Sequence, residues 1–179
     1  MKAAKVRYAA EPDESSIDRF PEQSNSSQLK RASMSDAKVQ PVESFKNLYN
    51  ELDKNTLTLE FLKSVYAQDI RFEDPFHAID GLEALHDYFS ELYENVREIS
   101  FDWHDSVVDA DQAFLTWTMT YRHPIISRGN PVAVNGVSRL VFKDGLVSSH
   151  RDYFDGGQML YEHIPALGMI VRKLKKRLA

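Results

Sequence analysis

Apolar residues in the first half of the chain recur at the spacing of amphipathic helices. The stripes are Phe45, Leu48, Tyr49 and Leu52, then Leu59, Leu62, Lys63 and Tyr66, and finally Leu82, Leu85, Phe89 and Leu92. Residues three, four and seven apart share one face of a helix, so we expect three helices, the last over Gly81–Tyr93. Thr56 or Thr58 stands where the second helix needs its N-cap. A short strand is expected at Asp69–Asp74, because it ends before Pro75.

The second half alternates between apolar and polar residues, which is the period of a half-buried strand. The apolar positions are Ile99, Phe101 and Trp103 in one strand, and Leu115, Trp117, Met119 and Tyr121 in the next. Pro131–Phe142 and Leu146–Asp155 predict two further strands, joined by a hairpin turn at Asp144-Gly145. Helices followed by an antiparallel meander indicate an α+β fold. We expect the sheet to curl round the helices and to leave a cavity at one end.

The two ends of the chain differ from this central domain, which we place at residues 42–158. Residues 1–41 contain few large apolar side chains and carry Pro12, Pro21 and Pro41, which predicts a disordered extension. Met34 is an alternative start of translation just before the folded part. Residues 159–179 are expected to form a basic amphipathic helix.

Composition narrows the classes of function. The chain has 22 Lys and Arg against 27 Asp and Glu, a net charge of −5, which argues against a general nucleic-acid binder. It has no cysteine, which excludes disulfide frameworks and thiolate metal sites and favours a reducing, cytoplasmic location. The longest apolar run, Ile164–Val171, is too short to span a bilayer.

The C-terminal helix allows two interpretations. Its apolar stripe is Leu160, Ile164, Leu167, Val171, Leu174 and Leu178, and its cations are Arg172, Lys173, Lys175, Lys176 and Arg177. Such a helix can make weak contact with an anionic membrane surface or an acidic protein. Alternatively it docks on its own domain, and the cations complement its dipole.

The segment from Val65 to Phe76, Val-Tyr-Ala-Gln-Asp-Ile-Arg-Phe-Glu-Asp-Pro-Phe, closely resembles the ketosteroid isomerase family. The order of elements over residues 43–158 resembles the wider superfamily of nuclear transport factor 2-like and SnoaL-like domains. This resemblance implies a conical, curved antiparallel sheet wrapped round the N-terminal helices, also called a cystatin-like barrel. It further implies a deep apolar pocket for a small apolar ligand, and a homodimer formed through the outer face of the sheet.

Two site residues follow from the resemblance. Asp74 matches the catalytic base of the isomerases, a carboxylate that takes a proton next to a carbonyl group. Its alternative role is to cap the turn before Pro75. Tyr49 lies near the tyrosine that hydrogen-bonds the developing oxyanion. Its alternative role is that of a core tyrosine on the first helical stripe.

The chain departs from the pattern of both enzyme groups on the strand before Phe142. Ser138 stands where the isomerases have a second, protonated aspartic acid. The epoxide-hydrolase branch of the superfamily needs an arginine and an aspartate two residues apart, where this chain has Gly136 and Ser138. Neither set of catalytic residues is therefore complete.

The last strand offers further polar candidates. His150, Asp152 and Phe154 share one face, which the resemblance places inward, so His150 and Asp152 are candidates for an acid–base pair. In the alternative arrangement this face is solvated, and Val147 and Tyr153 point to the core. The remaining predicted ligand contacts are Ser138, Trp117, Met119, Tyr121, Phe154, Phe76 and His77. No close-spaced pair of ligands supports a metal site.

Two hypotheses of function result. The first is a cofactor-free isomerase or hydratase that moves a proton in a small apolar carbonyl compound, with Asp74 as base, Tyr49 and Ser138 as donors, and His150 with Asp152 as auxiliary pair. The second is a non-catalytic domain that binds a ligand or another protein and docks through its basic C-terminal helix.

Overall fold

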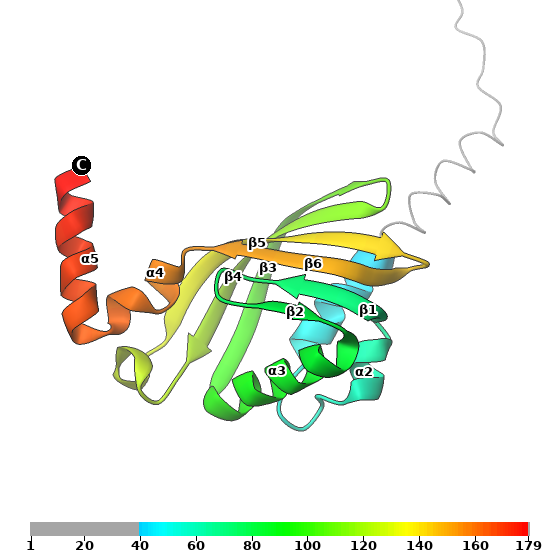
Figure 1. Ribbon diagram of the computed structural model, residues 1–179, viewed down its shortest axis with the longest axis horizontal. Coiled ribbons are helices and arrows are strands. Elements are labelled where there is room, and N and C mark those ends of the chain that lie inside the picture. Colours follow the sequence, from blue (N-terminus) through cyan, green and yellow to red (C-terminus); the bar gives the residue numbers. More distant parts are fainter. Residues whose placement is uncertain (1–39, 179) are drawn as a thin grey trace, which may run out of the picture.

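The computed structural model of the chain describes residues 40–178. A curved sheet encloses the helices at one end, and a helical arm stands apart at the other (Figure 1). The expected N-terminal extension, with Met34, lies outside the described residues, except that residues 40 and 41 already belong to the first helix. This helix runs through residues 40–51 and buries Val42, Phe45 and Leu48 on one stripe, as the spacing predicts.

The second helix, α2 (Leu59–Lys63), is shorter than the apolar pattern indicates. The Thr58 hydroxyl caps it and accepts the amide hydrogen of Phe61 at 3.1 Å. Its last turn is closed by tighter i→i+3 bonds, from the Val65 amide to the Leu62 carbonyl at 3.0 Å among others. The chain then extends, so Tyr66 begins the first strand. Its predicted place on the helix was wrong.

Helix α3 (Leu82–Asn95) forms where it is predicted. Gly81 precedes it with a φ of +94°, a conformation that a residue with a Cβ atom rarely adopts. The buried side chains of α3 are Leu82, Leu85, Phe89 and Tyr93, while Leu92 is half-buried against the same core.

Six strands form one sheet in the order β2-β1-β6-β5-β4-β3. Their bounds are β1 Tyr66–Glu73, β2 Ala78–Asp80, β3 Glu98–Asp109, β4 Gln112–Arg122, β5 Val132–Lys143 and β6 Leu146–Phe154. The order is linear, so the curved sheet stays open between β2 and β3. All neighbouring strands are antiparallel except β1 and β6, which are parallel.

The hairpin between β5 and β6 turns at Asp144-Gly145, as predicted. Both residues have positive φ, +52° and +81°, which matches the right-handed twist of the two strands. Beyond the turn the register shifts, because Val141 pairs with Ser149 while Phe142 pairs with Val147. This bulge changes the alternation along β6.

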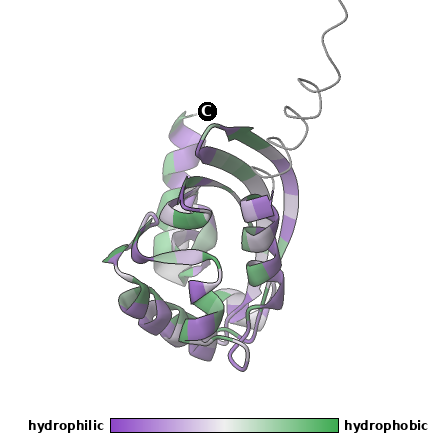
Figure 2. Cartoon of the chain, turned by 90° about the vertical axis from the view of Figure 1, so that its right-hand side faces the viewer, coloured by the Kyte–Doolittle hydropathy of each residue, from purple (hydrophilic) through white to green (hydrophobic). Residues whose placement is uncertain are grey.

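Helices and sheet share one core on the concave side of the sheet. Viewed after a 90° turn, the strands form a curved wall along which hydrophilic and hydrophobic residues alternate (Figure 2). One buried cluster joins helix 40–51, α2 and α3 to the sheet. A second cluster lies on β4 and β5 and consists of Trp117, Met119, Tyr121, Val132 and Val134.

The C-terminal segment forms three pieces rather than one helix. Helix α4 (Gly156–Met159) and the 3₁₀ turn η2 (Tyr161–His163) come first. Helix α5 (Pro165–Leu178) follows and stands away from the body (Figure 1). A proline at the first helical position explains this late start. None of the helices within residues 40–178 is long and apolar enough to cross a membrane.

Candidate functional site

A cavity of about 610 Å³ opens between helix α3, the concave face of the sheet and the start of the C-terminal segment. Most of its wall is apolar or aromatic, formed by residues that include Phe72, Phe89, Ile99, Phe101, Met119, Met159 and Leu160. Three carboxylates interrupt this apolar wall, and two of them, Asp74 and Asp152, are largely buried, whereas Glu91 is exposed. A concave apolar site with few polar groups is the usual form of a small-molecule pocket.

Asp74 lies in the tight turn between β1 and β2, and its side chain is only 6% exposed. Its Oδ1 accepts the amide hydrogens of Phe76 and His77, both at 2.7 Å, and Oδ2 accepts the hydroxyl hydrogen of Tyr88 at 2.9 Å. Burial and the neighbouring Asp74 carboxylate raise the pKa of Tyr88, so this phenol remains a donor. Asp74 therefore lines the cavity and also caps its own turn.

Asp152 lies on β6, directly opposite Ser138 on β5. Its Oδ1 receives the Ser138 hydroxyl at 2.5 Å and lies 2.8 Å from Nε2 of His150. Ser138 is positioned in turn by the indole N–H of Trp117, which donates to its Oγ at 2.9 Å. Within residues 40–178 no hydrogen bond reaches Oδ2 of Asp152. One oxygen is thus fixed, and the other is available to a ligand.

A line of buried groups connects Asp152 to the first helix. His150 is 1% exposed, and its Nδ1 lies 3.0 Å from the Tyr66 hydroxyl. The Tyr66 hydroxyl lies 2.9 Å from that of Tyr49, which again lines the cavity. Burial raises the pKa of both phenols far above the ordinary value, so neither ionises near neutral pH.

The direction of these hydrogen bonds depends on which ring nitrogen of His150 carries a proton. When Asp152 is a carboxylate, Nε2 of His150 donates to it, Nδ1 accepts from Tyr66, and Tyr66 accepts from Tyr49. Every hydrogen bond in this line then runs towards Asp152, and the hydroxyl hydrogen of Tyr49 is donated to Tyr66. The opposite direction needs a proton on Nδ1 of His150, which then donates to Tyr66 while Tyr66 donates to Tyr49. Tyr49 can offer its hydrogen to a ligand in that arrangement, or when it gives up its bond to Tyr66. The two cavity groups are therefore coupled through His150 and Tyr66.

The predicted site residues fall into two layers. Those that line the cavity are Tyr49, Asp74, Phe76, His77, Met119, Tyr121 and Asp152. Ser138, Trp117 and His150 lie behind the wall and touch Asp152 or its partners. Phe154 packs between Phe76 and Trp117, with ring centroids at 5.8 and 6.3 Å. We therefore do not treat Ser138, Trp117, His150 or Phe154 as groups that touch a ligand.

The two alternatives for β6 are both partly right. His150 is buried and Asp152 lines the cavity, as the resemblance implies, but Val147 is buried as well. The bulge near Ser148 makes this possible, because one extra residue lets positions of opposite parity point inward. Tyr153, expected in the core in the alternative arrangement, is 47% exposed.

The structure explains the departure at Gly136. Trp117 lies across from Gly136 on the neighbouring strand, and a Cβ atom at that position would stand 2.2 Å from the indole ring. The indole occupies the space that an arginine would need, and this placement lets its N–H reach Ser138. The epoxide-hydrolase pair is thus replaced by a group that holds Asp152.

Sequence reasoning missed Tyr88 and Tyr66 as site residues. Tyr88 stands three residues after Leu85 and four before Leu92, on the half-buried side of α3. A phenol on such a stripe usually needs a partner for its hydroxyl, which is the signal that could have pointed to it. Tyr66 was assigned to a helix, which hid its place beside His150.

No three His, Asp or Glu side chains in the described part of the chain come together as metal ligands. The comparisons with known proteins agree with the fold. Residues 45–150 match the SnoaL-like domain family. The chain belongs to the SnoaL-like family. A search of the curated proteins found no match to this SnoaL-like domain.

Solved structures with the same fold show little sequence identity to this SnoaL-like chain. A nuclear transport factor 2-like protein of unknown function from Burkholderia pseudomallei is 14% identical, with a TM-score of 0.59 over 69% of this chain and 94% of that one. A putative SnoaL-like polyketide cyclase from Jannaschia is 18% identical, with a TM-score of 0.57 over 78% and 92%. A hypothetical protein with a ketosteroid isomerase-like fold from Catenulispora acidiphila, in complex with trimethylamine, is 13% identical, with a TM-score of 0.58 over 69% of this chain and 90% of that one.

Proposed function

We propose that this SnoaL-like domain is a cofactor-free isomerase or hydratase that moves a proton in a small apolar carbonyl compound. The observation that carries the proposal is the environment of Asp152, a carboxylate with one oxygen fixed and the other free at an apolar cavity. A base in such a place is poorly solvated and correctly oriented at once.

In the isomerase reaction, Oδ2 of Asp152 takes a proton from the carbon next to the carbonyl group. The C–H electron pair moves into the substrate as an enolate, and Asp152 later returns the proton to another carbon of the conjugated system. Oδ1 of Asp152 keeps its hydrogen bonds from Ser138 and His150 while Oδ2 carries the proton, and the Tyr49 hydroxyl can turn its hydrogen from Tyr66 to the enolate oxygen. In the hydratase reaction, the same carboxylate orients and deprotonates a water molecule.

Asp74 has a supporting role in this proposal. Both of its oxygens accept hydrogen bonds from its own turn or from Tyr88. It shapes the cavity wall and keeps Phe76 and His77 in place, whereas the proton moves to and from Asp152. The assignment differs from the sequence-based expectation, in which Asp74 is the base.

The test is deuterium incorporation from D₂O into a panel of apolar ketones that carry hydrogens next to the carbonyl group. We expect the protein to accelerate this exchange above the rate in buffer, with saturation as the ketone concentration rises. Binding is measured in parallel by ligand-observed NMR. If ketones bind but exchange no faster than in buffer, the enzyme hypothesis is contradicted.

A second candidate function is a non-catalytic binding domain. It is favoured by the saturated hydrogen bonding of Asp74 and by the absence of the isomerase and epoxide-hydrolase partners at Ser138 and Gly136. Ketone binding without exchange is the result that this candidate expects. The homodimer and the cytoplasmic location stay predictions.

A further inference from the structure

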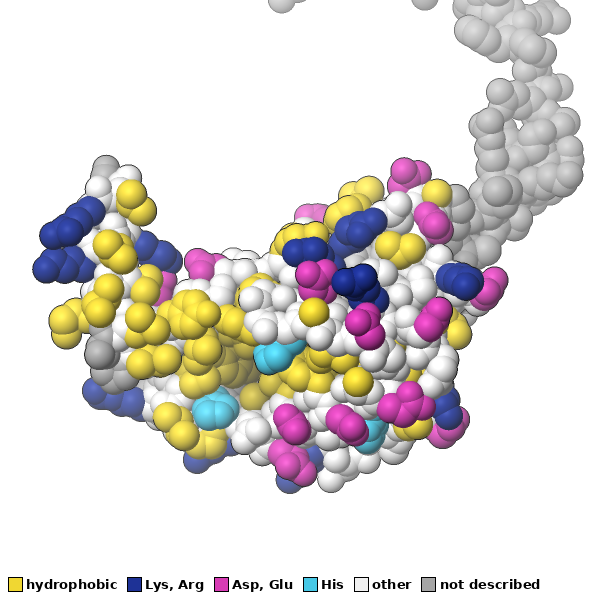
Figure 3. Space-filling model, in the orientation of Figure 1, with side chains coloured by type: hydrophobic (Ala, Val, Ile, Leu, Met, Phe, Trp, Pro, Cys, Tyr) yellow, Lys and Arg dark blue, Asp and Glu magenta, His cyan; other side chains and the backbone are white. Residues whose placement is uncertain are grey.

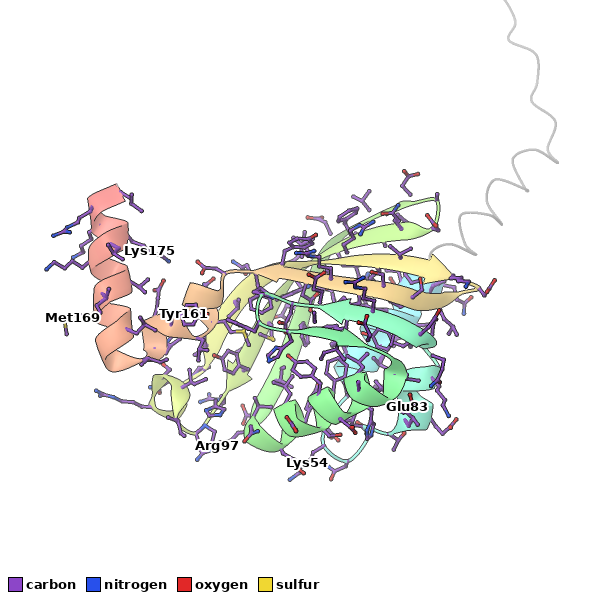
Figure 4. The ribbon with its side chains drawn as sticks, viewed as in Figure 1. Lys54, Glu83, Arg97, Tyr161, Met169 and Lys175 are labelled. Atoms are coloured by element: carbon purple, nitrogen blue, oxygen red, sulfur yellow. The ribbon has the colours of Figure 1, made fainter. Side chains whose placement is uncertain are left out.

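Helix α5 exposes an apolar stripe. Leu167, Ile170, Leu174 and Leu178 are 37%, 55%, 53% and 89% exposed, and their spacing of three and four residues places them on one side of the helix. Met169 is 67% exposed on another side and points away from the body (Figure 4). In one short helix, exposed apolar residues gathered on one side indicate a surface that contacts something else.

Cations flank this stripe. Helix α5 contains no acidic residue, and five of its last seven positions are Arg or Lys. Lys175 pairs within the C-terminal segment, because its Nζ lies 2.5 Å from Glu162 of η2 and 3.5 Å from Asp155, the N-cap of α4. Lys173, Lys176 and Arg177 form no ion pair with any described residue. Their charges are available to a partner.

The stripe is continuous with the mouth of the cavity. Met159 and Leu160, just before η2, line the cavity, and the Tyr121 hydroxyl donates to the Met159 carbonyl. Tyr161 and Ile164, between the cavity and α5, are 40% and 42% exposed. Figure 3 shows apolar side chains over the arm and over a hollowed area of the body on the same face of the molecule.

The basic character of α5 favours an anionic partner surface over a second copy of α5. The chain as a whole has a net charge of −5 although α5 is strongly basic, so the remaining surface is acidic. Two α5 helices that met across a symmetric dimer would bring their cations together. An anionic lipid surface instead attracts the cations and accepts the apolar stripe among its acyl chains.

We propose that α5 docks this protein on an anionic lipid surface, with the mouth of the cavity turned towards the lipid. The apolar stripe lies in the interface, and Lys173 and Arg177 contact the head groups. The apolar ligand then passes between bilayer and cavity along Tyr161 and Ile164. Docking does not depend on whether the cavity is catalytic.

The test is flotation of the full chain with vesicles of phosphatidylcholine containing about one third phosphatidylserine, and with vesicles of phosphatidylcholine alone. We expect binding to the anionic vesicles only, weakened by added salt. Ile170→Ser together with Leu174→Ser should reduce binding at least about tenfold, and Lys173→Gln together with Arg177→Gln should do so as well. Met169→Ser is the matched control and should leave binding unchanged.

Three results would overturn the proposal. The first is absence of wild-type binding, or equal binding to neutral vesicles. The second is loss of binding on charge removal with full binding by the Ile170→Ser, Leu174→Ser variant, because the stripe then has no part in the contact. The third comes from sedimentation velocity: a dimer that this variant converts to monomer would show that a second copy covers the stripe. Unchanged circular dichroism and melting temperature establish that each variant folds.

Discussion

The two largely buried carboxylates of the cavity are held in two different ways. Asp74 is fixed by amide hydrogens of its own turn, at Phe76 and His77. Asp152 is fixed by side chains from two neighbouring positions in the sheet, Ser138 and His150. A carboxylate held by backbone amides of its own turn needs only a short local sequence, and it stabilises that turn. A carboxylate held by buried side chains requires several polar groups to be desolvated together, which is costly unless all of them are satisfied.

The second arrangement is satisfied throughout. No buried side-chain nitrogen or oxygen in residues 40–178 lacks a hydrogen-bond partner. The line from Trp117 through Ser138, and the line from Tyr49 through Tyr66 and His150, both end at Oδ1 of Asp152. The contrast teaches that the polar core of this domain is organised round Asp152, whereas the segment that carries the family resemblance contains Asp74.

The largest effect on stability is expected from Gly136→Ala. The new Cβ atom would collide with the Trp117 indole, whose Cη2 would lie 2.2 Å away. Displacing the indole also removes its hydrogen bond to Ser138, so this change weakens the support of Asp152 but leaves the support of Asp74 intact. We expect a loss of about 3 kcal/mol or more in the free energy of unfolding, measured by urea denaturation. A loss below about 1 kcal/mol would show that the indole can move without cost.

An intermediate loss of stability compares the supports of the two carboxylates, Ser138 for Asp152 and Tyr88 for Asp74. Ser138→Ala leaves the buried Trp117 N–H without its acceptor, which should cost about 1–3 kcal/mol. Tyr88→Phe removes one of the donors to Asp74 but leaves both backbone bonds, so we expect only about 0.5–1 kcal/mol. Both values come from urea denaturation at neutral pH. Equal losses of stability would show that the two carboxylates are supported in the same way, contrary to this prediction.

The smallest stability effect comes from the ionisation of Tyr49 and Tyr66, which is negligible near neutral pH and grows in alkali. Burial raises the pKa of Tyr49 and Tyr66 above the ordinary value near 10. The unfolded chain releases these protons first, so stability is unaffected below about pH 10 and falls as the pH rises beyond it. Absorbance at 295 nm should show these tyrosines ionising only on unfolding. Tyr121, whose pKa burial raises only to about 12, serves as the internal comparison.

Much of the fold follows from local patterns. Helix α3 and strand β4 carry unbroken periods of 3.6 and 2, and Asp144-Gly145 has the conformational freedom that its turn needs. The end of α2 was not predictable, because β1 takes over at Tyr66 through pairing with the distant strand β6. The bulge in β6 is of the same kind, since pairing with both β1 and β5 determines it. Strand β2 was not predictable because three residues are too few to show a period.

The candidate site was predictable in part. The residue types were found, because the family resemblance carries Asp74, Ser138 and Asp152, and His150 shares a strand face with Asp152. Their connections were not. The contact of Trp117 with Ser138 depends on the missing side chain at Gly136, and the contact of Tyr66 with His150 joins residues 84 positions apart. A single sequence contains no local signal for either.

The central claim is that Asp152, and not Asp74, exchanges the proton. The most direct measurement compares Asp152→Asn with Asp74→Asn in the deuterium-exchange assay, with ketone binding followed by NMR in both variants. Asparagine preserves the shape of either side chain and removes its basicity. We expect Asp152→Asn to lower the exchange rate at least about 100-fold with binding retained, and Asp74→Asn to lower it less than about tenfold. The reverse order would contradict the claim and return the role of base to Asp74.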